Sequence, residues 1–138
     1  MVHALHTIAR LLKPGGVLID IHPGTARPEI VVQTPAGPRF AGYLDEAGGF
    51  AEYGLAQAAL DETVRDKTYT LEHQGGFAFA THAGSLAALQ DYFAENWKSA
   101  ILTPPVLRAV STAFGGAGSG KEIVVTEQIL IARLRLRS

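Results

Sequence analysis

The sequence predicts an α/β domain, and three observations support this prediction. An amphipathic helical segment ends near Leu12 and is followed by a glycine-rich turn and a short apolar strand. Helical and strand-like patterns then alternate along the chain. The last segment, residues 121–137, carries apolar residues on both faces of a strand, so we expect most of it to be covered twice. A length of 138 residues suits one domain, residues 1–138.

Composition excludes several classes of protein. Apolar residues make up 47% of the chain and charged residues 18%, which excludes a disordered chain. A net charge of -1 gives no support for binding to nucleic acid. The absence of cysteine excludes a disulfide framework, a thiolate metal site and a catalytic thiol. No apolar run approaches the ~20 residues that span a bilayer, so we expect a soluble, cytoplasmic protein with no membrane or nucleic-acid partner.

The first helix should pack one apolar stripe against the strand that follows it. Pro14-Gly15-Gly16 forms a turn that ends the helix at Leu12 or Lys13. Residues 17–21 then predict a strand that begins with three apolar residues, as is typical of a parallel strand covered on both faces. The stripe consists of Leu5, Ile8, Leu11 and Leu12.

This helix, turn and strand resemble a known element. The run Leu11-Leu12-Lys13-Pro14-Gly15-Gly16-Val17-Leu18-Ile19-Asp20 is similar to an element late in the sheet of class I methyltransferases that use S-adenosylmethionine. The resemblance implies that the chain is the C-terminal part of a Rossmann-like methyltransferase sheet, with an inserted β-hairpin and helices. It also implies a long antiparallel strand that ends the sheet beside the strand after the turn. Residues 122–136 are well placed to be that strand, with residues 69–82 as the penultimate one.

The same resemblance sets an expectation about the cofactor. In that family S-adenosylmethionine is held mainly by a glycine-rich loop after the first strand and by an acidic residue that ends the second strand. Both features lie upstream of the element found here, so we expect the chain to begin too late to contain them. The isolated chain is then expected to hold no cofactor and to be inactive alone.

The middle of the chain predicts a hairpin, a helix and two short strands. Residues 29–34 and 38–43 flank Pro35-Ala36-Gly37 and predict a β-hairpin outside the main sheet. Residues 50–67 predict a surface helix. Residues 69–72 and 76–82 predict strands, with Gln74-Gly75-Gly76 as a turn or bulge between them.

Two helices should precede the last strand. Ser85 is the expected N-cap of a helix that runs through Trp97, and Thr103-Pro104 begins another. The aromatic residues of the first of these helices are interpreted as core, with the lining of an apolar pocket as the alternative. They are Tyr92, Phe93 and Trp97.

A glycine-rich segment, residues 115–121, matches the spacing of a phosphate-binding loop up to its lysine. The context argues against that function, because such a loop leads from a strand into a helix and here a helix precedes and a strand follows. Glu122 also stands where a Ser or Thr would bind magnesium. We therefore interpret the segment as a flexible loop.

Asp20 and His22 are the best candidates for a substrate-binding site, and His82 is a third. Residues two apart on a strand share a face, and a carboxylate beside a histidine can orient a general base. The alternative is that Asp20 caps the following loop and that His22 is half-exposed and structural. A metal site built from His22, His73 and His82 with a carboxylate is not favoured, because their spacing contains no close ligand pair.

The charged residues outside this region are interpreted as solvated. Arg133, Arg135 and Arg137 alternate along the last strand, so they should share a solvent-facing side. The acidic residues interpreted in the same way are Asp45, Glu46, Asp61, Glu62 and Glu72.

Two functional hypotheses follow from different classes. In the first, the chain derives from enzymes that transfer a methyl group from S-adenosylmethionine to a small acceptor, and residues 24–97 with Asp20 and His22 form the acceptor side. Activity would then need a polypeptide that supplies the missing N-terminal half. In the second, the chain is a non-catalytic dimerisation or small-ligand-binding domain, because a sheet cut at its middle exposes the edge of strand 17–21. A homodimer is the simplest cover for that edge.

Overall fold

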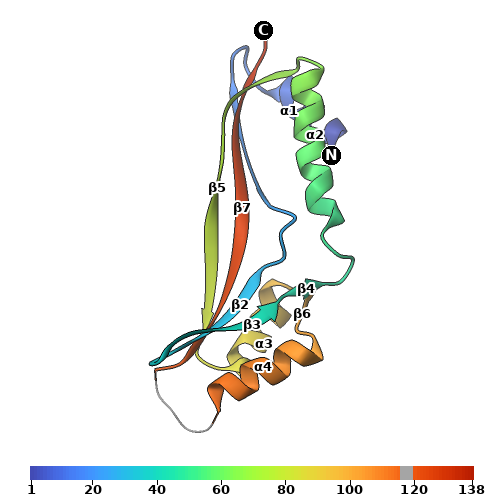
Figure 1. The fold of residues 1–138 in the computed structure, drawn as a ribbon. Helices are drawn as coiled ribbons and strands as arrows, with labels where there is room; N and C mark the ends of the chain where they lie inside the picture. The colour runs from blue at the N-terminus through green and yellow to red at the C-terminus, as the bar shows by residue number, and fades with distance from the viewer. Residues whose placement is uncertain (116–119) are drawn as a thin grey trace. The chain divides into compact units, whose positions relative to one another are not determined.

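The computed structural model describes residues 1–115 and 120–138. Over these residues the protein has a mixed α/β architecture with four helices, a five-stranded sheet and a two-stranded sheet (Figure 1). The helices are α1 (Val2–Leu11), α2 (Ala51–Arg65), α3 (Leu86–Asn96) and α4 (Pro104–Phe114). The large sheet contains β1 (Val17–Pro23), β2 (Glu29–Thr34), β3 (Gly37–Tyr43), β5 (Tyr69–Ala83) and β7 (Glu122–Leu136). The small sheet contains β4 (Asp45–Glu46) and β6 (Ala100–Ile101).

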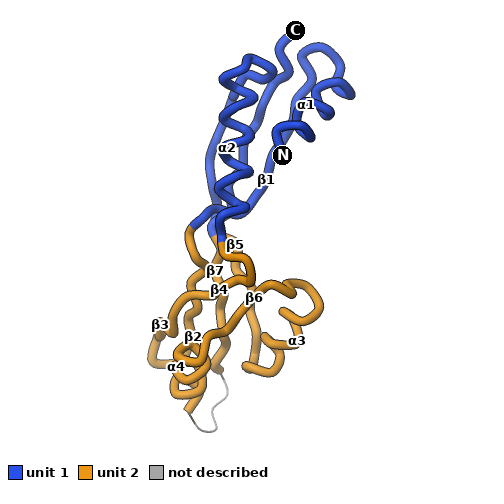
Figure 2. The backbone as a smooth tube through the Cα atoms, turned by 90° about the vertical axis from the view of Figure 1, so that its right-hand side faces the viewer, with its two compact units in different colours: residues 1–25, 50–77, 128–138 blue, residues 26–49, 78–127 orange. Residues whose placement is uncertain are grey.

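The chain divides into two compact units (Figure 2). Unit 1 contains residues 1–25, 50–77 and 128–138. Unit 2 contains residues 26–49 and 78–127. The long strands β5 and β7 each contribute residues to both units.

The large sheet is antiparallel and has the order β1-β7-β2-β3, with β5 also paired to β7. Residues 129–135 of β7 lie opposite β1, and residues 122–126 lie opposite β2. The prediction of a parallel strand covered on both faces at residues 17–21 is wrong. Leu18 packs on the core of unit 1, whereas Ile19 and Ile21 are 51% and 58% exposed, because the helices of this unit cover only one face of β1.

The core of unit 1 lies between two helices and one face of β1, β5 and β7. The hydroxyl of Tyr69 in β5 donates to the carbonyl oxygen of Leu5 in α1 at 2.9 Å, which ties the first helix to the sheet. In α2 the small residue Ala59 and the neighbouring Leu60 are buried, whereas Leu55 is exposed. The buried core residues are Leu5, Ala59, Leu60, Tyr69, Ala132 and Leu134.

The core of unit 2 lies between α3, α4 and the strands β2 and β7. Ser85 caps α3 as predicted, because its side-chain oxygen accepts a hydrogen bond from the backbone N–H of Ala88 at 3.1 Å. The predicted hairpin exists, but its place outside the main sheet is wrong, since β2 pairs with β7. The buried core residues are Ile30, Val32, Leu44, Ala83, Leu89, Phe93, Val106, Val110, Ile123 and Val125.

Strand β5 is continuous from Tyr69 to Ala83, so of the turn or bulge predicted at Gln74-Gly75-Gly76 the turn is absent. A side chain at Gly76 would place its Cβ 3.0 Å from the carbonyl oxygen of Ile129 in β7. Glycine is therefore needed at this position for the close approach of two backbones and not for a change of direction.

The glycine-rich segment has the context that the sequence predicted. α4 ends at Phe114 and β7 begins at Glu122, so a helix precedes the segment and a strand follows it. Nζ of Lys121 donates a hydrogen bond to the carbonyl oxygen of Phe114 at 2.7 Å. The lysine that would bind phosphate in such a loop therefore already has a partner. The predicted flexibility of this loop concerns residues 116–119, which lie outside the described residues.

Candidate functional site

Asp20 and His22 meet, as their spacing on one strand predicted. Both lie on β1, and Oδ2 of Asp20 is 2.5 Å from Nδ1 of His22. The strand alternates between the exposed residues Ile19 and Ile21 and the more buried Asp20 and His22. His22 is only 8% exposed, so the alternative interpretation was wrong about its exposure.

The hydrogen bond fixes which ring nitrogen of His22 carries a proton. An ionised carboxylate only accepts hydrogen bonds, so Nδ1 of His22 must be the donor to Asp20. The other ring nitrogen, Nε2, is buried and has no hydrogen-bond partner among the described residues.

Asp20 can orient His22 as a general base, but in this conformation His22 cannot reach a substrate. A general base must lie within hydrogen-bond reach of the proton that it removes, directly or through one water. Nε2 of His22 is closed off from solvent, and a dissolved substrate does not reach it. Asp20 and His22 therefore form a partly buried hydrogen-bonded pair on one face of β1.

His82, the third predicted site residue, lies in unit 2, whereas Asp20 and His22 lie in unit 1. Its Nδ1 is 3.0 Å from Oε1 of Glu122, and more than half of its side chain is exposed. This contact is an exposed ion pair when the ring is protonated, and such pairs contribute little to stability.

A metal ion has no evident place among the residues described. Over residues 1–115 and 120–138, no group of three or more His, Cys, Asp or Glu side chains is close enough to hold one. In α1, Nε2 of His6 lies 2.8 Å from Oδ2 of Asp66, the C-cap residue of α2. Hydrogen bonds from Thr68, and then from His6, hold the pKa of Asp66 below its usual value.

Sequence reasoning missed a buried carboxylate in unit 2. Glu46, which was interpreted as solvated, is only 6% exposed. Its Oε1 accepts hydrogen bonds from the indole N–H of Trp97 and from the hydroxyl of Ser99, the latter at 3.2 Å. These partners lie 51 and 53 residues away in the chain, so no local pattern reveals them.

A second carboxylate of unit 2 is influenced by Glu46. Burial, and then the nearby charge of Glu46, raise the pKa of Glu127 above its usual value. Perturbed carboxylates mark functional sites and structural clusters alike. The hydrogen bonds of Glu46 to Trp97 and Ser99 favour a structural role for this group, in which the indole ring is held in place.

The arginines of β7 are paired. The Nε atom of Arg133 donates to Oε2 of Glu72 at 2.7 Å, and Nε of Arg135 donates to Oε1 of the same carboxylate. Hydrogen bonds from Arg135, and then from Arg133, lower the pKa of Glu72. Arg133 and Arg137 are exposed and the side chain of Arg135 is 43% exposed, so the predicted solvent-facing side is confirmed. What the prediction lacked is the pairing of Arg133 and Arg135 with Glu72.

Comparisons with protein-family models, with curated proteins and with solved structures find no match for this chain. None of the helices formed by residues 1–115 and 120–138 has the length and hydrophobicity needed to cross a bilayer.

Proposed function

We propose that the chain is a methyltransferase-like domain that contributes the acceptor side of a site whose cofactor half is supplied by other residues. The observation that carries this proposal is the pairing of β1 with β7. All seven residues of β1 have antiparallel partners in β7, from Val17 opposite Arg135 to Pro23 opposite Ile129. The resemblance of residues 11–20 implied this neighbour for the strand after the Lys-Pro-Gly-Gly turn.

Two further features support the proposal. α1 ends at Leu11, and Gly15 adopts a φ of 72° in the turn that leads to β1, a conformation that glycine adopts readily. β5 pairs with β7 as well, so β7 lies between β1 and β5. That order agrees with residues 69–82 as the penultimate strand.

The described residues do not fit S-adenosylmethionine by themselves. The glycine-rich segment before Lys121 follows α4 and precedes β7, so it does not lead from a strand into a helix. Gly48 and Gly49 do lead from β4 into α2, but β4 is only two residues long and belongs to the small sheet. The imidazole of His22 is bonded to Asp20 and closed off from solvent. We therefore assign no methyl-transfer step to this chain alone, and its proposed role is to shape the acceptor side.

Isothermal titration with S-adenosylmethionine, with the mass of the protein determined on the same sample, tests this proposal. We expect no saturable binding by the isolated chain. A gene directly upstream that encodes a glycine-rich first strand would supply the partner, and the co-purified pair should then bind the cofactor. Saturable binding by the chain alone would contradict the proposed division of the site.

The alternative function, a non-catalytic association domain, is favoured by one specific observation. Ile19 and Ile21 are exposed on the same face of β1, and Ile131 lies opposite Ile21 on β7. Among the described strands, β1 pairs with β7 alone, so its second edge is open. An open edge beside an apolar face is a typical site for a partner. A homodimer with no affinity for the cofactor would support this function.

A further inference from the structure

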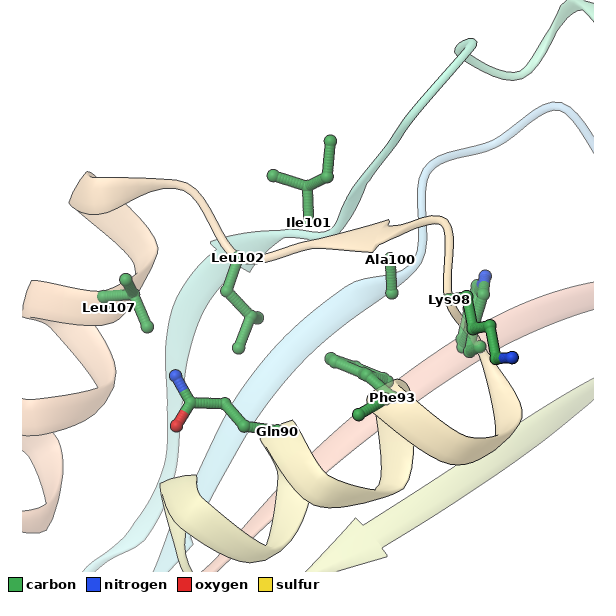
Figure 3. Close-up of a pocket in the computed structure, with 9 residues that line it drawn as sticks. Gln90, Phe93, Lys98, Ala100, Ile101, Leu102 and Leu107 are labelled. Carbon is green, nitrogen blue, oxygen red and sulfur yellow. The ribbon is translucent and has the colours of Figure 1, made fainter.

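Unit 2 carries a hollow that none of the proposed functions uses. It lies between α3, the segment 97–102 and the first turn of α4, and its volume is ≈ 410 Å³ (Figure 3). Pockets for small organic ligands lie in the range of about 300–1,000 Å³. We call this hollow the α3–α4 groove. The lining residues on which the argument depends are Gln90, Phe93, Trp97, Lys98, Leu102 and Leu107.

The wall of the groove is apolar and fixed. In Figure 3 the side chains of Phe93, Leu102 and Leu107 turn toward one another. Phe93 is 5% exposed and meets the ring of Trp97 edge to face, with 5.6 Å between the ring centroids. The indole N–H of Trp97 is bonded to the buried carboxylate of Glu46, which prevents the ring from turning. A wall fixed before binding lowers the entropic cost of holding a ligand.

The charge in the lining is positive. Lys98 lies at one end of the groove and Gln90 near Leu107 at the other (Figure 3). Lys98 takes part in none of the ion pairs found among the described residues. The carboxylate of Glu46 is not part of the lining, and its Oε1 already accepts bonds from Trp97 and Ser99. An unpaired cation beside an apolar wall is complementary to an anion with an apolar body.

The backbone near the groove argues against a phosphate ligand. Helix N-termini bind phosphate through free N–H groups, but α4 begins with Pro104 and Pro105, and proline has no N–H. The N–H of Leu107 is already bonded to the carbonyl oxygen of Thr103 at 2.9 Å. A carboxylate needs fewer donors, and the ammonium group of one lysine can pair with it.

We propose that the α3–α4 groove binds a small organic carboxylate with an apolar, preferably aromatic, body. The carboxylate lies at Lys98, and the apolar body lies on Trp97, Phe93 and Leu102. This inference stands on unit 2 alone and does not require the proposed methyltransferase relationship.

The test uses the fluorescence of Trp97, which is the single tryptophan of the chain. Phenylbutanoate is titrated into the full chain, with the neutral phenylbutanamide as the matched ligand. We expect a saturable change in fluorescence with a dissociation constant in the millimolar range, as is usual for a ligand of this size. The amide should bind at least about fivefold more weakly, because it cannot form the charge-assisted bond to Lys98.

Two variants locate the site. Lys98→Gln should weaken binding of phenylbutanoate at least about fivefold and leave binding of the amide unchanged. Ala94→Phe places a ring in the groove from an exposed position of α3 and should abolish binding of both ligands. Lys13→Gln, in unit 1, is the matched control for loss of one positive charge and should bind as the unchanged protein does. Urea unfolding of each variant tests whether the protein is still folded when the fluorescence change on binding is lost.

Three outcomes would overturn the proposal. The first is the absence of a saturable signal in the unchanged protein. The second is equal affinity for the carboxylate and the amide, which would leave the groove apolar but not specific for an anion. The third is a change in oligomeric mass on Ala94→Phe without any response to phenylbutanoate, which would assign the groove to a second copy of the chain.

Discussion

The hydrogen bond between Asp20 and His22 can be tested with a variant that keeps its shape. Asp20→Asn retains an oxygen that accepts from Nδ1 of His22 but removes the charge that strengthens the bond. We expect a loss of about 1 kcal/mol in the free energy of unfolding, measured by urea denaturation. Asp91→Asn on the exposed side of α3 is the matched control and should change the midpoint little. Equal losses of unfolding free energy in the two variants would mean that the charge of Asp20 does not strengthen its hydrogen bond to His22.

Glu127 provides a pH-dependent prediction at the same scale. Its pKa is raised by burial and then by the charge of Glu46, so the folded protein favours the protonated carboxyl. At neutral pH the ionised group therefore destabilises the fold, and Glu127→Gln should stabilise it, by no more than about 1 kcal/mol because solvent screens a partly exposed group. The stability gained by Glu127→Gln should disappear as the pH falls below about 4.3, the usual pKa of a Glu side chain. Urea unfolding of both proteins as a function of pH measures this difference.

Glu72→Gln is the matched comparison with the opposite sign. Arg135, and then Arg133, lower the pKa of Glu72, so its contribution to stability is present above the usual pKa of a Glu side chain and is lost as the pH falls through the lowered value. Glu72→Gln should therefore reduce stability at neutral pH and have no effect in strong acid. Parallel pH profiles for the variants of Glu72 and Glu127 would contradict both assignments.

At the scale of one element, Gly42 in β3 is a position where a side chain would both clash and strain the backbone. Its φ is 136°, and a Cβ there would lie 2.8 Å from Cγ2 of Val106 in α4. The register between β2 and β3 shifts beside it, between Ile30 and Val31. Gly42→Ala should therefore destabilise the protein by about 1–3 kcal/mol, through both backbone strain and overpacking.

Gly75→Ala in β5 is the control for that variant. A Cβ at Gly75 would meet nothing within 4 Å, and its backbone does not require glycine, so we expect no loss of stability. The midpoints of thermal unfolding of the two variants should differ clearly. A Gly42→Ala protein as stable as Gly75→Ala would show that β3 and α4 separate easily enough to accept a methyl group.

The elements show how far the sequence determines the fold. Helix boundaries were predicted well, because a capping serine at residue 85, prolines at 104 and 105 and the turn at 14–16 are local signals. Of the turn or bulge predicted at Gln74-Gly75-Gly76, the turn was wrong, since a glycine that allows close approach to Ile129 has the same sequence signature as one in a turn. Which strands pair is a non-local property, and for that reason the hairpin was wrongly placed outside the sheet.

The candidate site likewise has features with a local sequence signal and features that depend on non-local contacts. The meeting of Asp20 and His22 was predictable, because residues two apart on a strand share a face. The burial of His22 was not, since it depends on what covers that face of β1. Glu46 and Trp97 are brought together by folding across 51 residues, so neither the fixed indole nor the α3–α4 groove has a local sequence signal.

At the scale of the whole molecule, the exposed isoleucines of β1 predict how stability depends on concentration. If a second copy covers Ile19 and Ile21, folding is coupled to association and the thermal midpoint rises with protein concentration. We expect this rise in the unchanged chain, together with a dimeric mass by light scattering. The double variant Ile19→Thr with Ile21→Thr keeps β-branched side chains suited to a strand and should give a monomer whose midpoint does not depend on concentration.

The paired variant Leu55→Thr is the control for that experiment. Leu55 is 64% exposed in α2, so removing it takes away a surface apolar side chain without touching β1. It should leave both the mass and the concentration dependence unchanged. A monomeric unchanged chain, with a midpoint independent of concentration, would refute the homodimer. The open edge and apolar face of β1 would then be available to a different polypeptide, as the methyltransferase-like proposal requires.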